Sequence, residues 1–305
     1  MSAAIEITRP GVYDIPFDAY QADPIPGGSL SSSGARKLLP PSCPALFRWW
    51  ADNAQKDTTR DMDLGTAAHL EVLGVGADVV VVEGSGKDPN AWRTNDDKAA
   101  VQAARDAGKT PITPRDARVV ADMANALRAD PNASRLLDPA HGDPEQTLVW
   151  FDAEFGVWRR ALLDYLPRPS RQRRLIIPDY KTTKSAAPDD IAKSIHNFGY
   201  HQQAEWYLAG AEALGLPSDG PPAFVLIFQE TSAPYLVTVV ELDRSALEIA
   251  RTRNRKALDI FRQCTASGVW PGYSDDVVSV GLPTWAEYQH ADAEAAGLFD
   301  IQESA

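Results

Sequence analysis

The stretch RRLIIPDYKTT at residues 173–183 places a carboxylate and an amine at the end of an apolar strand. The run Leu175–Ile177 is typical of a strand that is covered on both faces. Asp179 and Lys181 follow two residues apart, and alternate residues of a strand project from the same face. The stretch therefore predicts a buried strand that carries an acid and an amine into one site.

Two β-rich runs precede this strand, TLVWFDAEFG at 147–156 and VWRRALLDYLP at 157–167. Gly156 and the loop PRPSRQRR separate the three runs, which favours a three-stranded antiparallel meander. Asp164 then lies near the end of one strand and Asp179 near the end of the next. Carboxylates on neighbouring strands can bind Mg²⁺, because hard divalent cations take oxygen ligands. Such an ion polarises a phosphate and acidifies a bound water, which is what phosphodiester hydrolysis needs.

The flanking sequence alternates helices with further strands. We expect a helix over about 189–214 that is broken at Gly199, strands at 222–230 and 235–243, and an amphipathic helix that ends at Gly268. This order predicts an α/β (α+β) fold with a central mixed sheet flanked by helices. Residues 1–30 resemble an extended N-terminal arm, 31–285 a single domain with a helical insertion at about 84–144, and 286–305 an acidic flexible tail.

The net charge of -12 argues against a protein that coats DNA indiscriminately, because nonspecific affinity comes largely from Lys and Arg. DNA contacts must then be local, and two basic runs supply candidates, residues 157–184 with a net charge of +6 and residues 251–262 with a net charge of +4. We expect DNA-binding by Arg159, Arg160, Arg171, Arg173, Arg174 and Lys184, although a solvated surface would show the same pattern. The two cysteines suggest packed thiols. No apolar run is long enough to span a membrane and no signal peptide is recognisable, so we expect a cytoplasmic protein.

Each candidate site residue also has a structural interpretation. The D-x-K pattern occurs twice, at Asp96/Lys98 and Asp179/Lys181, and only the second follows an apolar strand. Even that pair could be a surface ion pair. His69, on the helix that contains LGTAAHLEVL, could be a hydrogen-bonded core residue. Gln203 and Tyr207 share a helix face that could be ordinary surface, and Glu145 could cap a turn.

Several motifs in one order resemble the exonuclease VIII-like (RecE-type) family of the PD-(D/E)XK nuclease superfamily. They include LSSSGARKLLPPSCPALFRWW, LGTAAHLEVL, GKTPITP, DYKTTKSA and YHQQAEWYLAG, and the similarity covers roughly residues 30–275. The resemblance implies a restriction-endonuclease-like core. It implies metal ligands at His69, Asp164, Asp179 and the backbone carbonyl of Tyr180, and a catalytic Lys181. Gln203 and Tyr207 would form the supporting Q-x-x-x-Y motif, with Glu145 and the Thr182–Thr183 hydroxyls around the site.

The resemblance also implies an activity. It predicts a Mg²⁺-dependent exodeoxyribonuclease, with Mn²⁺ able to substitute and two ions per site, that degrades linear double-stranded DNA 5′ to 3′ for phage-type homologous recombination. It further implies a ring-shaped homo-oligomer, a single-strand annealing protein as partner, and a phage or prophage origin. The alternatives are a RecB/Cas4-like nuclease on single-stranded or flap DNA, a non-catalytic DNA-binding scaffold, and a purely structural acidic cluster.

Overall fold

The computed structural model describes residues 5–53 and 58–300, and the chain divides into two units, residues 1–270 and 271–305. The strands of the first unit are β1 (Gly11–Tyr13), β2 (Leu30–Ser31), β3 (Val79–Val81), β4 (Thr110–Ile112), β5 (Gly142–Asp152), β6 (Val157–Pro167), β7 (Ile176–Thr183), β8 (Ala223–Glu230) and β9 (Val237–Glu241). Its helices are α1 (Phe17–Gln21), α2 (Ser32–Lys37), α3 (Pro44–Asp52), α4 (Arg60–Leu73), α5 (Asn95–Asp106), α6 (Pro114–Ala129), α7 (Pro131–Leu136), α8 (Pro188–Phe198), α9 (Tyr200–Ala213) and α10 (Arg244–Ser267).

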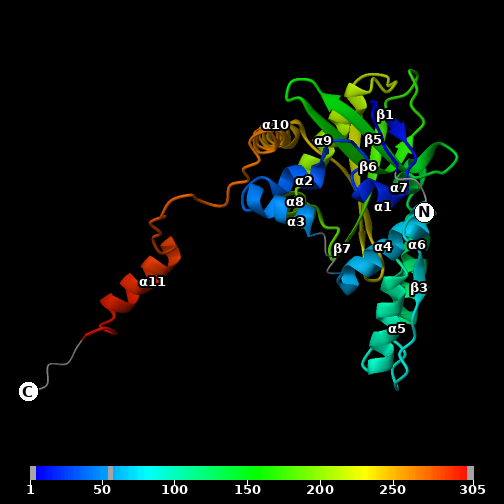
Figure 1. The fold of residues 1–305 in the computed structure, drawn as a ribbon. Helices are drawn as coiled ribbons and strands as arrows, with labels where there is room; N and C mark the ends of the chain where they lie inside the picture. Colours follow the sequence, from blue (N-terminus) through cyan, green and yellow to red (C-terminus); the bar gives the residue numbers. More distant parts are fainter. Residues whose placement is uncertain (1–4, 54–57, 301–305) are drawn as a thin grey trace, which may run out of the picture. The chain divides into compact units, whose positions relative to one another are not determined.

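The strands form mixed sheets, as Figure 1 shows. One sheet has the order β1-β5-β6-β2, a second has the order β7-β8-β9, and β3 pairs with β4. The β5–β6 and β8–β9 pairs are antiparallel, whereas β7–β8 and β2–β6 are parallel. The predicted α+β architecture, a mixed sheet with helices packed against it, is confirmed.

The predicted three-stranded meander is wrong at its third strand. β5 and β6 form the expected hairpin, but β7 pairs in parallel with β8. Helices α8 and α9 lie between these two strands in the chain and return it to the same end of the sheet, as a parallel connection requires. The expected break at Gly199 is confirmed, since this glycine has φ +68° and separates α8 from α9.

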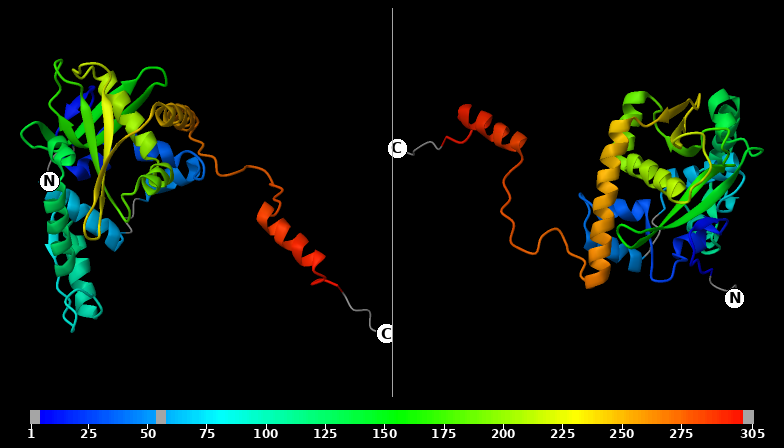
Figure 2. Two further views of the ribbon diagram at one scale, coloured as in Figure 1. Left: turned by 180° about the vertical axis from the view of Figure 1, so that it is seen from behind. Right: turned by 90° about the horizontal axis from the view of Figure 1, so that it is seen from above.

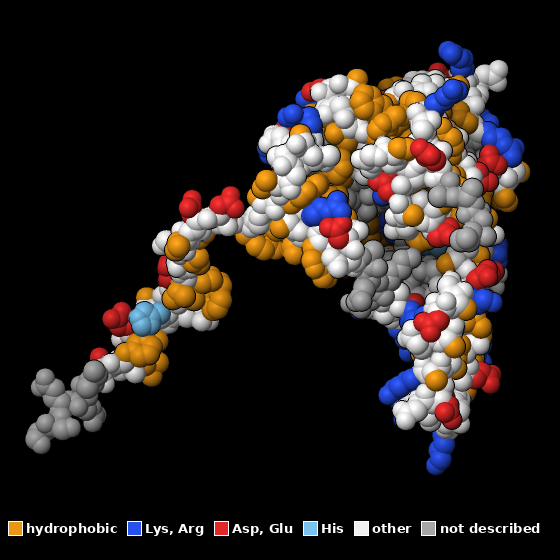
Figure 3. Space-filling view, in the orientation of Figure 1, with side chains coloured by type: hydrophobic (Ala, Val, Ile, Leu, Met, Phe, Trp, Pro, Cys, Tyr) orange, Lys and Arg blue, Asp and Glu red, His pale blue; other side chains and the backbone are white. Residues whose placement is uncertain are grey.

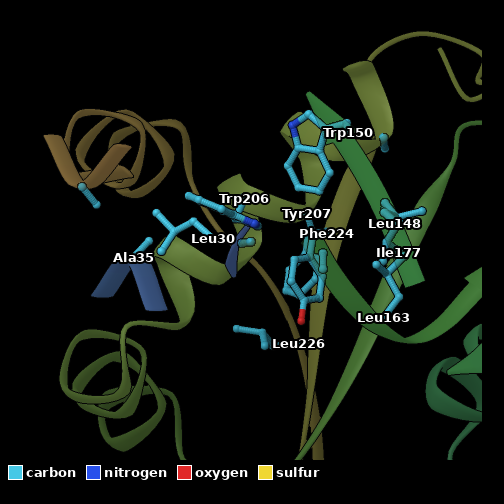
Figure 4. Close-up of a cluster of buried hydrophobic side chains, with 14 of the residues drawn as sticks. Leu30, Ala35, Leu148, Trp150, Leu163, Ile177, Trp206, Tyr207, Phe224 and Leu226 are labelled. Carbon is cyan, nitrogen blue, oxygen red and sulfur yellow. The ribbon is translucent and has the colours of Figure 1, made fainter. Parts of the chain in front are cut away.

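The core lies between the sheets and α9, where Trp206 and Tyr207 pack against Trp150, Phe224 and their neighbours (Figure 4). Gly210 lets α9 approach the sheet closely, because a Cβ at that position would lie 2.8 Å from the Trp150 ring. Helix α10 lies beside α9 (Figure 2, right), and Asn254 of α10 donates hydrogen bonds to Gln202 and Glu205 of α9. Both free cysteines are buried, as predicted.

The predicted helical insertion contains α5, α6 and α7. Capping boxes begin α5 at Thr94 and α6 at Thr113. The fully buried Met123 and Leu127 of α6 pack with Ala67 and Ala68 of α4. Two ion pairs between the segments, Arg60–Asp116 and Arg105–Asp63, each at 2.7 Å, tie the insertion to α4.

Residues 5–30 are packed against the sheet, so the prediction of an extended arm is wrong for this part. β1 pairs antiparallel with β5, and Ile7, Ile15, Tyr20 and Ile25 bury their side chains in one cluster with Val149. The apolar residues are too widely spaced to show a periodicity, so only their tertiary partners identify them as core. Residues 1–4 of the predicted arm lie outside the described residues.

The second unit contains one helix, α11 (Thr284–Ala295), among its described residues. The predicted tail at 286–305 therefore begins within a helix, and its last five residues lie outside the described part. The boundary between the units falls after Trp270, whereas the predicted domain extends to residue 285. None of the helices described is both long enough and apolar enough to cross a membrane.

Candidate active site

Strands β6 and β7 meet at two carboxylates. Within the described chain no backbone ladder joins these strands, which belong to separate sheets. The link is made by a side chain instead, because Oδ2 of Asp164 on β6 accepts a hydrogen bond from the backbone N–H of Tyr180 on β7 at 2.8 Å. This contact brings Asp164 next to Asp179, as predicted.

Asp179 is fully buried and contacts two polar side chains. Its Oδ1 accepts a hydrogen bond from the amide of Gln203 at 2.7 Å. Its Oδ2 lies 2.5 Å from Nζ of Lys181 but accepts no well-aligned hydrogen bond. The Asp179–Lys181 pair is therefore a buried ion pair, and the interpretation as a surface pair is excluded.

Burial and the charge of Asp164 raise the pKa of Asp179 to about 7, although Lys181 opposes this shift. Burial alone would lower the pKa of Lys181, but the charges of Asp179 and Asp164 outweigh it and leave this pKa above its usual value. Lys181 is thus held as a cation. Carboxylates that share one site and one ammonium are an arrangement found at functional sites.

His69 lies on α4 and faces the same carboxylates. Its Nε2 is 2.9 Å from the carbonyl oxygen of Tyr180 and 3.8 Å from Oδ2 of Asp164. The side chain is 29% exposed, so it is not an enclosed core histidine. α4 can approach β7 closely because Gly65 has no side chain, since a Cβ there would lie 3.2 Å from the Thr182 hydroxyl.

Glu145 stands opposite Asp164 in the β5–β6 hairpin. The register pairs Pro144 with Tyr165 and Gln146 with Leu163, and it skips the position between them. Glu145 has φ +47°, a left-handed conformation that is strained for a residue with a side chain. Burial, then Asp164 and Asp14, raise its pKa. Like charges at directly opposed strand positions are destabilising, so this pair is typical of a functional site rather than of a turn cap.

Asp14 was not predicted from the sequence. It follows β1 in the N-terminal segment and lies near enough to raise the pKa of Glu145. Nothing in PGVYDIPF distinguishes this acid from other loop acids. Only the pairing of β1 with β5 brings it to the site.

Gln203 and Tyr207 hold the two strands from one helix. Gln203 contacts Asp179 of β7, and the Tyr207 hydroxyl donates to the carbonyl of Leu162 on β6 at 2.6 Å. Burial raises the pKa of Tyr207 well above its usual value, so its hydroxyl stays protonated and can donate this bond. The pair therefore faces the sheet and is not ordinary helix surface. Of the two threonines after Lys181, Thr183 donates to the carbonyl of Ser185 at 3.0 Å.

Two of the predicted DNA-binding arginines are not available to DNA. Arg159 is buried, pairs with Asp152 at 3.1 Å and stacks between Trp150 and Trp206. The Arg160 guanidinium pairs with Asp23 at 2.8 Å and lies over the Tyr20 ring. The prediction is wrong for both, because the N-terminal segment and α9 cover the two faces of β6.

The remaining predicted arginines and the lysine lie at the surface. Arg171, Arg173, Arg174 and Lys184 are exposed. Arg173 and Arg174 line a groove beside β7 and β9 together with Arg135 and Arg168, and Arg135 was not predicted. On the face drawn in Figure 3, Lys and Arg side chains are scattered among Asp and Glu.

The donor atoms suit a hard divalent cation, but the side chains alone do not complete its site. Among the described residues no three His, Cys, Asp or Glu side chains form a metal-binding cluster. The carbonyl oxygen of Tyr180 supplies a further donor atom, and it accepts a hydrogen bond from Nε2 of His69 at 2.9 Å; the tautomer with its proton on Nδ1 would free both atoms for an ion. Neighbouring ligands in an octahedral Mg²⁺ shell are about 3 Å apart. The buried Oδ2 of Asp179 faces the Lys181 ammonium at 2.5 Å without an aligned hydrogen bond, so its lone pairs can still be directed at a metal ion.

Comparisons with known proteins identify a family and a shared fold. The family model described as "PDDEXK-like domain of unknown function (DUF3799)" matches residues 42–280. No curated protein matches the chain in sequence. The crystal structure of a candidate exonuclease from Eubacterium rectale superposes with a TM-score of 0.58 at 10% identity, and the match covers 90% of this chain and 98% of that chain. At this identity the structural match shows a shared fold alone.

Proposed function

We propose that this chain, which belongs to the PDDEXK-like family whose model it matches over residues 42–280, is a nuclease that depends on a divalent metal. Its proposed substrate is linear duplex DNA, which it would degrade from the ends. The fold predicted from the sequence, a PD-(D/E)XK core, is confirmed. One observation carries the proposal. The fully buried Asp179 contacts Lys181 and Gln203 and adjoins Asp164. Burying such a group of charges costs desolvation energy and does not stabilise the fold, so a functional role explains it better.

Nucleases of this superfamily generally use divalent metals, and here Asp164, Asp179, His69 and the Tyr180 carbonyl would bind the ion. When bound, such an ion polarises the scissile phosphate and lowers the pKa of the attacking water. Lys181 lies 2.5 Å from Asp179, where its amine would position the attacking water and stabilise charge that develops on the phosphate. Gln203 orients the Asp179 carboxylate, and Tyr207 fixes the strand that carries Asp164.

The choice of substrate rests on the resemblance to exonuclease VIII-like enzymes. Their activity would make this chain an exodeoxyribonuclease that resects duplex ends 5′ to 3′ for recombination. The description of the Eubacterium rectale protein as an exonuclease supports the same reaction class. The ring-shaped assembly, the annealing partner, a second metal ion and the choice of Mg²⁺ belong to this proposal as well.

A degradation assay tests the proposal. The purified chain is incubated with linear duplex labelled separately at each end, with Mg²⁺, with Mn²⁺ and with a chelator. We expect progressive shortening from the 5′ ends with either metal and none with the chelator. Asp179→Asn should abolish shortening, whereas Asp96→Asn should not, since Asp96 belongs to the same D-x-K pattern but lies exposed on α5.

The assay also separates the alternatives. A non-catalytic scaffold would shift the mobility of the duplex without shortening it. A RecB/Cas4-like enzyme would prefer single-stranded arms to blunt duplex. Equal activity of Asp179→Asn and the wild type would remove the assigned site.

A further inference from the structure

An aromatic pair, the exposed Phe198 and the partly buried Tyr200, flanks the junction of α8 and α9. Phe198 ends α8 and Tyr200 begins α9, with the left-handed Gly199 between them. The two rings stack with centroids 5.6 Å apart and an angle of 30° between their planes. Phe198 is 55% exposed, so its ring offers an apolar face to solvent. We call Phe198 and Tyr200 the aromatic step.

The aromatic step begins at the candidate active site. Nζ of Lys181 lies 5.2 Å from the centre of the Tyr200 ring, within the range of a cation–π contact. Tyr200 also packs against Phe228 of β8 at 5.9 Å, which anchors its ring to the sheet. A rigid aromatic surface thus leads from the catalytic amine to solvent.

A positive side chain borders the step. Gly199 is in contact with Arg36 of α2, because a Cβ on this glycine would lie 2.6 Å from Cδ of Arg36. No carboxylate in the described part of the chain forms an ion pair with Arg36, whereas many other arginines of the protein are paired. The guanidinium is therefore available for an anion next to the two rings.

The size and charge of this surface match one nucleotide. Aromatic rings stack nucleobases regardless of sequence, and an arginine neutralises a phosphate. A stable contact between two proteins needs about 800 Å² on each partner, far more than two rings and a guanidinium provide. Given the proposed nuclease function, on which this inference rests, we propose that the aromatic step stacks an unpaired nucleobase beside the scissile phosphate, with Arg36 bound to a flanking phosphate.

Substitution of the exposed ring tests this site. Phe198→Ala removes the outer surface of the step and should lower kcat/KM on linear duplex by about five- to a hundredfold, the range that stacking of one base supplies. Phe198→Tyr should restore most of the activity. Phe151→Ala is the matched control, because Phe151 is also exposed and also contacts one aromatic ring, that of Trp158, away from the site.

A second measurement follows the base directly. Duplexes carrying 2-aminopurine near either end are bound in Ca²⁺, which takes oxygen ligands as Mg²⁺ does. Stacking on the step should quench the fluorescence with the wild type and with Phe151→Ala, and the quenching should be lost with Phe198→Ala.

Three results would overturn the inference, and they differ from one another. If Phe198→Ala matches Phe151→Ala in both measurements while the wild type degrades DNA, the step has no role and the nuclease proposal stands. If Phe198→Ala changes the subunit number in sedimentation, the ring belongs to a subunit contact. If the wild type neither binds nor cuts DNA, the proposed function fails and the inference fails with it.

Discussion

The amide of Gln203 donates a hydrogen bond to Oδ1 of Asp179 at 2.7 Å and so connects helix α9 to strand β7. The other oxygen of this carboxylate faces Lys181. Gln203 therefore decides which lone pairs of Asp179 remain available to a cation. Groups that orient a ligand in this way are part of a metal site as much as the ligands are.

Gln203→Ala should raise the Mg²⁺ concentration needed for half-maximal cleavage by about 10- to 100-fold, because Asp179 loses its orienting donor. Gln203→Glu should impair cleavage more than Gln203→Ala does, since it places a third carboxylate beside Asp164 and Asp179. Gln102→Ala, on the exposed face of α5, serves as the control. An unchanged Mg²⁺ requirement in Gln203→Ala would show that the hydrogen bond is only structural.

His69→Ala should raise the Mg²⁺ concentration needed for half-maximal cleavage by at least about tenfold. The reason is that the imidazole lies 2.9 Å from the Tyr180 carbonyl and would bind the same ion. Binding of Mn²⁺, measured by calorimetry, should weaken in parallel. His141→Ala is the comparison, since His141 lies exposed beside Asp138. Normal Mn²⁺ affinity in His69→Ala would exclude the histidine from the site.

Asp152→Ala should destabilise the fold strongly. It removes the carboxylate that pairs with the Arg159 guanidinium between Trp150 and Trp206, and leaves only the charge of Glu205, which forms no ion pair with this guanidinium. Removing one partner of a buried pair costs about 3–5 kcal/mol, whereas replacing both partners with apolar residues costs much less. Urea denaturation should therefore show a larger loss for Asp152→Ala than for the double variant Asp152→Leu/Arg159→Met. The opposite order would mean that the stacked guanidinium does not need Asp152.

The ion pair between Arg60 and Asp116 should make the insertion sensitive to acid. Burial opposes the charge of Asp116, but hydrogen bonds from Arg60 and Thr113 outweigh it, so the pKa of Asp116 is lowered. A carboxylate whose pKa falls on folding stabilises the protein above its unfolded pKa, about 3.9, and loses this effect as the pH drops through its folded pKa.

Asp116→Asn should therefore reduce stability at pH 7 by about 1 kcal/mol, a modest amount because the Arg60 side chain is half exposed. The difference from the wild type should shrink as the pH falls below about 4. Thermal unfolding at a series of pH values measures it, with Asp219→Asn in an exposed loop as control. A difference that persists at low pH would assign the effect to something other than charge.

Much of the catalytic cluster could be predicted from local pattern. Asp179 and Lys181 lie on one face of a strand because successive strand residues alternate between faces. Gln203 and Tyr207 lie on one face of a helix because residues four apart are neighbours on the helix surface. Glu145 was predicted to lie around the site. Its left-handed backbone and its position opposite Asp164 could not be predicted. These depend on where the ladder of the hairpin opens, which no short pattern encodes.

The sequence by itself determined the main helices and strands after residue 30, the break at Gly199 and the order of the acids, because propensity and periodicity act over a few residues. Only the tertiary structure decided which side chains reach solvent. Arg159 and Arg160 belong to a basic run, yet Arg159 is buried and Arg160 is largely covered, because elements remote in the chain cover the two faces of β6. The packing of the N-terminal segment and the parallel pairing of β7 with β8 were missed for the same reason. Burial and strand partners are set by contacts between residues that are distant in the chain.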